Sequence, residues 1–292
     1  MSFYDGGIRL LYAGSGSVAN ENAYITRNAF NLYSNDPMYV GYMYGTSGSL
    51  ANNRTNQINK SNVENIIESW YTATFNNSSD NNTKDALNNL LTNYINPSAI
   101  YCSDRSVSGA SPYDKNNDFL YSSRERLFSD YQESTIAPSY ACGATTEGYG
   151  HYFEEESNIA DKFTGSQTNK AGNTIGNGLL STSPAALITA DEIIFAGGKF
   201  QSESMAWYYY NGASDSSSIT ATRWWWTMSP CGYFSSNSDV FLIRGSNYPG
   251  YLDSNYVERN TRAIRPVISL KANVLWKSGT GAPSSPFEVE LP

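Results

Sequence analysis

The sequence has few of the residues with which enzymes and metalloproteins do chemistry. It contains a single histidine, His151, and three cysteines, Cys102, Cys142 and Cys231. The cysteine spacings match no zinc-binding pattern, and one histidine cannot complete a His/Cys ligand set. A nucleophile elbow, a phosphate-binding loop and a dinucleotide fingerprint are all missing. We therefore expect no metal site, no cofactor and no catalytic residues, and so a protein that is not an enzyme.

The odd number of cysteines fits one disulfide and one leftover thiol. Cys102 and Cys142 each follow a short β-like run, in IYCSDRS and SYACGA, and we expect these two to pair in an oxidising compartment. The alternative is three free thiols. The acidic run Glu154–Glu156, close to His151, is interpreted as a solvated turn, with calcium binding as its alternative.

Charge is scarce as well: charged residues make up 16% of the chain and leave a formal net charge of −8. A negatively charged surface repels a phosphate backbone, so we expect no nucleic-acid partner. No run approaches the ~20 apolar residues of a membrane span. The first residues also lack the basic and apolar regions of a signal peptide. Two localisations remain open: the cytosol, or the cell surface with a leader or N-terminal anchor absent from this sequence. We favour the second.

Tyrosine and small polar residues are abundant instead. Aromatic residues reach 14%, with 23 tyrosines, and serine, asparagine and glycine are frequent throughout. The stretch 229–260, SPCGYFSSNSDVFLIRGSNYPGYLDSNYVERN, concentrates this mixture. Tyrosine offers a large, rigid contact area, while serine and asparagine offer adaptable hydrogen bonds, as in antibody paratopes. The stretch predicts a binding surface, and the alternative is an ordinary polar surface loop.

Apolar periodicity predicts helices early in the chain and strands late. Residues 60–75 and 84–95 fit amphipathic helices, the first with Ser61 as N-cap and Glu64 at the capping-box position. Residues 183–198 fit a strand that enters a short helix. The expected strands share apolar runs bounded by glycine or proline: 7–14, 38–45, 223–230, 239–245 and 262–276. Because no repeat or linker interrupts this order, it predicts one α+β domain over residues 1–292.

The order of the motifs WWWTMSP, VFLIRG, GYLDSNYV and AIRPVISLKANV, with LITADEIIFAGG and IYCSDRS, resembles that of a family of Gram-positive envelope proteins. Some members carry pilin-like N-termini. Their domain is similar to the formylglycine-generating-enzyme version of the C-type lectin fold. The resemblance covers most of the chain. It implies a C-type lectin-like fold, with a twisted antiparallel sheet, two helices, long ordered loops and termini that lie close together.

In several relatives of this fold, the exposed segment before the last strand is the variable region of a diversity-generating retroelement. Adenine-directed mutagenesis of AAY codons can produce Asn, Tyr, Ser, Asp, Phe, Gly, Arg and Cys there, but not Trp, Lys, Met, Gln or Glu. Residues 231–261 contain no Trp, Lys, Met or Gln, and Glu258 is the one residue of a type that this mutagenesis cannot produce. The resemblance therefore implies a variable ligand-binding segment at about 231–261, in which Cys231 is a codon product.

For single residues, the resemblance implies a buried scaffold beneath an outward-facing set. The scaffold is Trp225, Met228, Ser229, Pro230, Val240, Gly250, Leu252, Val257, Arg265, Pro266 and Leu270. The ligand-binding residues are Tyr233, Phe234, Ser236, Asn237, Arg244, Asn247, Tyr248, Tyr251, Asn255 and Tyr256. Asp239, Glu258 and Asn260 are further candidates.

The implied function is that of a non-catalytic receptor or adhesin at the cell surface, which binds an unknown protein or glycan. One alternative is a carbohydrate-binding module that stacks sugars on exposed rings, including those of Trp224–Trp226. A component of a pilus or phage particle is another. An enzyme of the formylglycine-generating type would need a second thiol, and Cys231 is the only cysteine in its half of the chain. The calcium-binding motifs Glu-Pro-Asn, Gln-Pro-Asp and Trp-Asn-Asp of lectins are absent.

Overall fold

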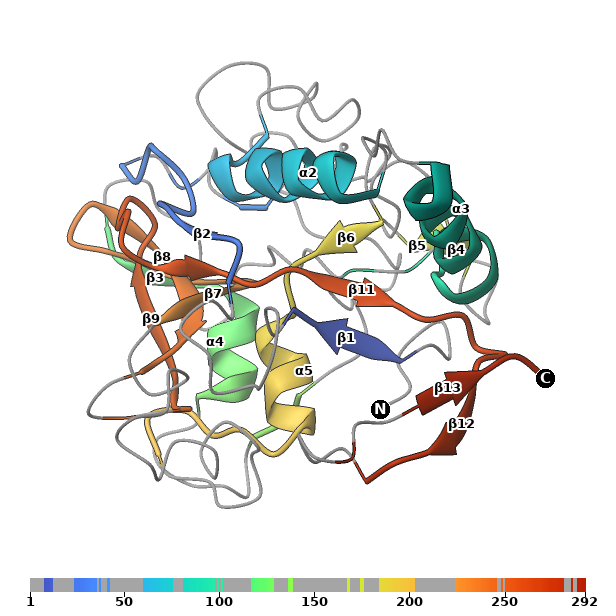
Figure 1. Ribbon diagram of the computed structural model, residues 1–292. Helices are drawn as coiled ribbons and strands as arrows, with labels where there is room; N and C mark the ends of the chain where they lie inside the picture. Colours follow the sequence, from blue (N-terminus) through green and yellow to red (C-terminus); the bar gives the residue numbers. More distant parts are fainter. Residues whose placement is uncertain are drawn as a thin grey trace.

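The computed structural model describes helices and several β-sheets, so the predicted α+β class is confirmed (Figure 1). The described residues are 8–12, 24–35, 37, 41–42, 60–75, 81–97, 99, 101, 117–128, 136–138, 167–168, 174–175, 184–202, 224–245, 248, 250–280, 285 and 288–292.

The helices are α2 (Asn62–Phe75), α3 (Asn81–Asn89), the π-helical turn η2 (Leu90–Tyr94), α4 (Ser122–Leu127) and α5 (Ala190–Phe195). The early strands are β1 (Arg9–Leu11), β2 (Thr26–Arg27), β3 (Phe119–Leu120), β4 (Gln167–Thr168), β5 (Thr174–Ile175) and β6 (Ala185–Ala186). The late strands are β7 (Trp225–Phe234), β8 (Asn237–Ile243), β9 (Leu252–Tyr256), β10 (Ala263–Ile264), β11 (Val267–Ser269), β12 (Leu275–Ser278) and β13 (Glu288–Glu290).

Strand β7 is the central strand of the largest sheet, whose order is β2-β10-β7-β8-β9 with β3 also on β7. β8 pairs with β7 over most of its length, while β10 contacts the start of β7 and β3 contacts its end. The pairs are antiparallel except β10–β7, which is parallel, so the expectation of an antiparallel sheet is wrong at this pair. β10 reaches β7 by a crossover from β9 and not by a hairpin, so its direction need not alternate.

Pro230 lies inside β7, although the sequence predicts a strand that ends there. The register with β8 shifts on both sides of Pro230, between Trp226 and Gly232. A bulge tolerates proline because proline has no N–H to give to the ladder. β7 therefore continues to Phe234 and joins β8 through the two-residue turn Ser235–Ser236. Both turn residues have positive φ, 50° and 64°, as a type I′ hairpin requires.

A second sheet, in the order β1-β11-β6, joins the beginning of the described chain to its end. Leu10 pairs with Ile268, and Val267 pairs with Ala186, both in antiparallel register. The first described strand therefore pairs with a late strand, β11, whereas the last described strand, β13, pairs with β12. Arg9 ties this sheet to α5, because its Nε lies 3.2 Å from a carboxylate oxygen of Glu192.

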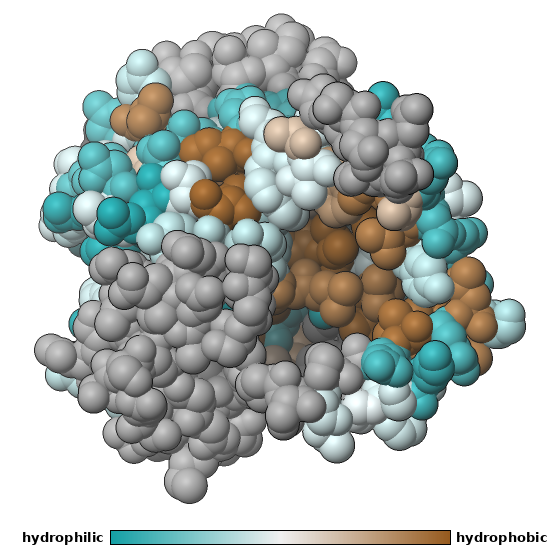
Figure 2. Space-filling view, viewed as in Figure 1, coloured by the Kyte–Doolittle hydropathy of each residue, from teal (hydrophilic) through white to brown (hydrophobic). Residues whose placement is uncertain are grey.

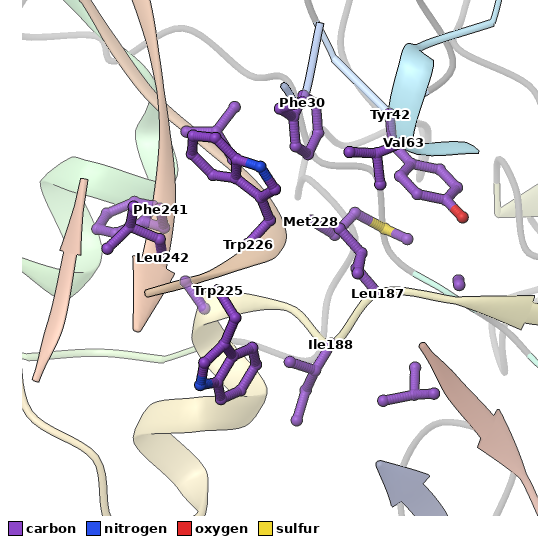
Figure 3. Close-up of a cluster of buried hydrophobic side chains, with 14 of the residues drawn as sticks. Phe30, Tyr42, Val63, Leu187, Ile188, Trp225, Trp226, Met228, Phe241 and Leu242 are labelled. Atoms are coloured by element: carbon purple, nitrogen blue, oxygen red, sulfur yellow. The ribbon is translucent and has the colours of Figure 1, made fainter. Parts of the chain in front are cut away.

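The tryptophans at the start of β7 anchor the core on both faces of the sheet. Trp225 and Trp226 are both buried. Figure 3 shows Trp226 turned towards Phe30 and Trp225 turned to the other side, near α5. The rings of Phe30 and Trp226 meet edge to face at 5.8 Å, and Trp226 Nε1 donates to the carbonyl of Asn28 at 3.0 Å. Such an aromatic pair stabilises the fold by about 0.5–1.5 kcal/mol beyond the contribution from burying its surface.

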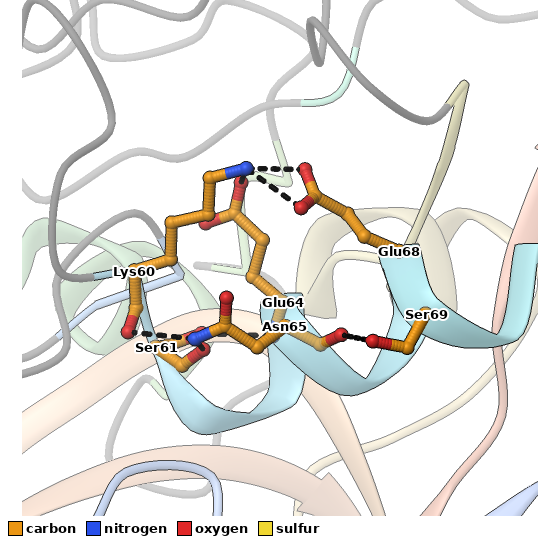
Figure 4. A network of polar contacts seen from close by, with 6 residues as sticks. All are labelled: Lys60, Ser61, Glu64, Asn65, Glu68 and Ser69. Carbon is orange, nitrogen blue, oxygen red and sulfur yellow. Dashed lines mark hydrogen bonds and ion pairs between the residues drawn. The ribbon is translucent and has the colours of Figure 1, made fainter. Parts of the chain in front are cut away.

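Helix α2 begins as predicted, but its capping box is half formed. Ser61 Oγ accepts from the backbone N–H of Glu64 at 3.0 Å, which confirms the N-cap. The Glu64 side chain does not return to the Ser61 N–H, which donates to the Tyr42 carbonyl at 3.4 Å. Instead Glu64 is buried, and neither carboxylate oxygen has a hydrogen-bond partner. Its ion-pair partner is Lys60, whose Nζ lies 4.0 Å away and 2.6 Å from Glu68 (Figure 4).

The other two predicted helices are also present, with small differences. α3 begins at Asn81, earlier than predicted, and the π-helical turn carries it to the predicted stop at Asn96 and Pro97. α5 has a complete capping box between Thr189 and Glu192. The strand expected before it is β6, and Gly197, with φ 96°, follows it as predicted. Of the strand predicted at 38–45, only residues 41 and 42 are described.

An apolar surface lies away from the largest sheet. Figure 2 shows apolar side chains gathered in a hollow over the region of β1 and β11. The exposed apolar residues of β1 and of the β12–β13 hairpin are Leu10, Leu275, Trp276 and Val289. β12 and β13 pair only with each other among the described strands, which leaves their apolar side chains in solvent.

We predict that the buried carboxyl of Glu64 makes folding less favourable as the pH rises. Burial raises the pKa of Glu64 well above its ordinary value, and Lys60 opposes this only in part. Below the ordinary pKa the folded and unfolded chains are both protonated. Above it the unfolded chain releases a proton that the folded chain keeps, so stability falls by up to about 1.4 kcal/mol per pH unit.

Urea unfolding of the wild type and Glu64→Gln at several values between pH 4.5 and 8 measures this effect. The variant, which cannot ionise there, should lack that part of the slope and gain stability relative to the wild type as the pH rises. Glu68→Gln, whose carboxylate is partly exposed and paired with Lys60, is the control and should not gain. Equal slopes for the wild type and Glu64→Gln would contradict the prediction.

Candidate functional site

The pairing of β7 with its two neighbours brings together residues that are far apart in sequence. Trp225 pairs with Ile243 of β8 and with Ala263 of β10. The residues just outside these pairs are Trp224, Arg244 and Arg262, so the register places both arginines beside the same indole. The Cζ atoms of Arg244 and Arg262 lie 4.5 Å and 4.4 Å from the centre of the Trp224 ring.

The segment between β8 and β9 adds two tyrosines to this group. Arg244 N–H donates to the carbonyl of Tyr251 at 2.8 Å, and Gly250 N–H donates to that of Arg244 at 2.9 Å. These bonds close the loop, and Gly250 supplies the positive φ of 80° that it needs. Tyr248 lies 4.5 Å from Arg244 Cζ and 5.3 Å, ring to ring, from Tyr251. We call Trp224, Arg244, Tyr248, Tyr251 and Arg262 the aromatic–arginine cluster.

Arg244 is held in place by Asp253 of β9. The Arg244 Nη1 to Asp253 Oδ2 distance is 3.2 Å, and the two side chains are 24% and 11% exposed. Asp253 Oδ1 accepts from Gln201 Nε2 at 2.7 Å, which fixes the carboxylate in turn. The guanidinium is therefore preorganised, stacked between two rings and paired on one edge, while its Nε has no acceptor.

Three of the predicted ligand-binding residues belong to this cluster: Arg244, Tyr248 and Tyr251. Tyr248 is 45% exposed, the most of any large apolar side chain described between 224 and 270. Asn255 and Tyr256 are half-buried further along β9, where they pair with Val240 and Asp239 and so lie towards the other end of β8. Arg259 Cζ lies 5.6 Å from the Tyr256 ring. Asn247 lies outside the described residues, as do Cys102, Cys142 and the expected disulfide between them.

The remaining predicted residues lie at the other end of β8, at the β7–β8 turn. A seven-residue strand separates the two ends by roughly 20–24 Å at about 3.4 Å per residue. Ser236 is exposed there, and Asn237 is half-buried and accepts from Ser34 Oγ at 3.1 Å. Phe234 lies half-buried, 5.0 Å from Arg124 Cζ. The predicted residues therefore form two groups and not one compact site.

Tyr233 is a correction. Its side chain is only 4% exposed, its hydroxyl donates to the Asn35 carbonyl at 3.0 Å, and its ring packs 5.8 Å from that of Phe119. The expectation that Tyr233 faces outward is therefore wrong. The sequence motif could not indicate this burial, because it comes from β3 and residues 34–35, which are distant in sequence. All the predicted scaffold residues, by contrast, are buried.

A second polar group lies beneath α4, around Cys231. The thiol is buried, and Arg124 Nη1 lies 3.1 Å from its Sγ. Burial raises the pKa of Cys231 to about 11 despite the opposing effect of Arg124. Ser254 Oγ donates to Asp239 Oδ2 at 3.1 Å, and burial raises the pKa of Asp239 to about 6. The thiol is thus protonated at neutral pH, which makes it a poor nucleophile.

Sequence reasoning missed Arg262 and Arg124 and left the role of Trp224 open. Arg262 lies one residue beyond the segment 231–261, and nothing local marks it as a neighbour of Trp224. The only available signal was the alternation of the WWW run, which places Trp224 and Trp226 on the same face in a regular strand. The pairing with β10 that brings Arg262 to Trp224 was not predictable from that pattern.

Two broader findings complete the description of the site. Among the described residues, no helix is long and apolar enough to cross a bilayer, and no group of three or more His, Cys, Asp or Glu side chains is placed to hold a metal ion. In comparisons with known proteins, no family model, curated protein or solved structure matches the chain.

We predict that Cys231 is almost unreactive in the folded protein. Its high pKa lowers the thiolate fraction about 100-fold relative to a free thiol, and burial restricts access further. Labelling with iodoacetamide at pH 8, followed peptide by peptide with mass spectrometry, should therefore modify Cys231 at least ~100-fold more slowly in the native protein than in urea. Equal rates in the two states would show that the thiol is accessible and ionised.

Proposed function

We propose that this protein is a non-catalytic ligand-binding protein of the cell surface, a receptor or adhesin that recognises a protein or glycan through the aromatic–arginine cluster. The observation that carries the proposal is the stacking of Arg244 between Trp224 and the exposed Tyr248. Tryptophan, tyrosine and arginine are the residues most enriched in binding hot spots.

The rigidity of the cluster supports recognition. Arg244 is held by Asp253 and by two rings, and Tyr251 is fixed by its backbone bond to Arg244. A side chain that is already ordered loses less conformational entropy on binding, which is worth about 0.5–1.5 kcal/mol for each immobilised side chain. The site also exposes both ring surface and N–H donors, so it offers apolar contact and directional hydrogen bonds together.

The low reactivity of the other polar group supports recognition over reaction. Cys231, which the enzyme alternative would use, is buried and protonated at neutral pH. A carbohydrate-binding module is the remaining alternative from another class. It is supported less well, because the Trp224 ring already lies against two guanidinium groups and has less free surface for a sugar.

We further propose that the fold is C-type lectin-like and that residues 231–261 are diversified by a retroelement. Support comes from the burial pattern of this segment: the proposed scaffold positions Val240, Leu252 and Val257 are fully buried. Residues such as Ser236, Tyr248 and Asn260 lie exposed between them. A near-copy of the DNA for 230–270 beside a reverse-transcriptase gene, differing at template adenines, is the expected genomic observation. Its absence from the complete genome would remove the diversification proposal.

We predict that replacing both tyrosines of the cluster, Tyr248→Ala and Tyr251→Ala, strongly weakens recognition and leaves the fold intact. Peptides selected from a random library, and hits from a glycan array, should converge on this face because it combines an exposed tyrosine with a stacked arginine. Their affinity for the double variant should fall at least ~10-fold, because each aromatic anchor contributes about 1–2 kcal/mol or more. The melting temperature should change by only a few degrees.

The matched control is Trp276→Ala, which removes a 65% exposed ring from β12. It should keep full affinity for the same peptides and glycans. The proposed site would be refuted by ligands that bind the double variant as tightly as the wild type. It would also be refuted by ligands whose affinity falls equally in Trp276→Ala. Unfolding of the double variant would place the two rings in the core and refute it as well.

A further inference from the structure

The face that carries the cluster is locally basic in a protein that is acidic overall. The chain has a net charge of −8, yet Arg244 and Arg262 both lie at Trp224. Arg259 packs on Tyr256 and is close enough for its charge to lower the pKa of Arg262. Only Arg244 has a carboxylate partner, Asp253. Across the described part of the chain, neither Arg259 nor Arg262 has a carboxylate oxygen within 4.0 Å. No carboxylate of the described residues therefore compensates these two guanidinium charges.

Two buried N–H donors at this face also have no hydrogen-bond acceptor. Arg262 Nη1 donates to Thr261 Oγ1 at 3.0 Å, but its Nε is buried without an acceptor, and so is Nε of Arg244. A guanidinium has five N–H donors and no acceptor. Leaving a buried donor unsatisfied costs about 1–3 kcal/mol.

The arginines also repel one another. The pKa of Arg262 is lowered by burial first, and then by the positive charges of Arg259 and Arg244. Gathering like charges on a partly buried surface is unfavourable unless something of the opposite sign neutralises them. The Trp224 indole and the Thr261 hydroxyl, both of which contact Arg262, carry no charge that could offset this repulsion.

We propose that the aromatic–arginine cluster, with Arg259 beside it, binds an oxyanion: a carboxylate, sulfate or phosphate group carried by the ligand. The inference rests on the proposed function and specifies the chemistry of its ligand. The planar fork of a guanidinium matches an oxyanion in a bidentate pair, whose hydrogen bonds are about twice as strong as those between neutral groups. Stacking on Trp224 fixes the plane of that fork, and Tyr248 and Tyr251 provide ring surface for the part of the ligand next to the anion.

The size of the basic patch limits the ligand to one or two anionic groups. The net charge of −8 repels an extended polyanion, whereas a single oxyanion interacts mainly with the nearest guanidinium groups because salt screens charges beyond about 8–10 Å. An uncharged ligand would leave the donors and charges of Arg262 and Arg259 unmatched.

The test uses simple anions as probes of the folded protein. Sodium sulfate, phosphate and acetate are titrated at constant ionic strength, with chloride as balancing salt, while the Nε–Hε signals of the arginines are followed by NMR. The signals of Arg262 and Arg259 should shift saturably with a millimolar dissociation constant. Arg262→Gln should weaken sulfate binding at least ~10-fold, and Arg259→Gln several-fold.

Lys277→Gln is the matched control, because it removes one positive charge from exposed β12 and should leave the dissociation constant unchanged. Because Arg262 is half-buried, Arg262→Gln could destabilise the fold, and Arg262→Lys is then the variant to test. Lysine keeps the positive charge but lacks the planar guanidinium fork, so sulfate binding should also weaken. The relative affinities for sulfate, phosphate and acetate tell which oxyanion is preferred. Shifts that do not saturate, or that are equal in Arg259→Gln and Lys277→Gln, would overturn the proposal.

Competition separates this inference from the proposed function. Sulfate should displace the library peptides that depend on Tyr248 and Tyr251, and those peptides should be rich in carboxylates. Peptides that need the two tyrosines but are not displaced by sulfate would support the proposed binding face and overturn the oxyanion inference. Saturable sulfate binding without tyrosine-dependent binders would instead sustain the anion site and refute the receptor proposal.

Discussion

The indole of Trp224 is the point on which the candidate site depends. It precedes the first residue of β7, which pairs with β8 on one edge and with β10 on the other. Each partner strand brings an arginine to it, Arg244 from the end of β8 and Arg262 from the start of β10. A shift of either register by one residue would reverse the side-chain direction and disperse the group. The site is therefore a consequence of strand pairing and not of one loop.

The same sheet has two chemically different ends. Around Cys231 and Asp239 the polar atoms are buried under α4, and burial raises both pKa values, so these groups stay protonated at higher pH than usual. At the Trp224 end the rings and guanidinium groups are partly exposed and held in fixed positions. The proposed recognition function uses the ordered, partly exposed end and needs no reactive group at the other.

Local features of the fold were predictable, and features that depend on distant partners were not. The N-cap Ser61 was predictable because its hydrogen bond joins residues within one turn of helix. The inward turn of Glu64 breaks the same pattern, since the Ser61 N–H bonds to a residue outside the helix. Tyr233 was misplaced for the same reason: β3 and residues 34–35 cover it. The buried scaffold positions of 231–261 were implied by the family resemblance, but the position of Arg262 required the parallel β10–β7 pair.

The most direct test of the central claim is the chemical shift of the arginine side chains beside Trp224. An aromatic ring shifts protons that lie over its face to high field, so the Hδ protons of Arg244 and Arg262 should both resonate upfield of their random-coil values. Trp224→Leu should return Arg262 to the random-coil range, and should move Arg244 only part of the way because Tyr248 remains. Random-coil shifts for both arginines in the wild type would contradict the strand register on which the site depends.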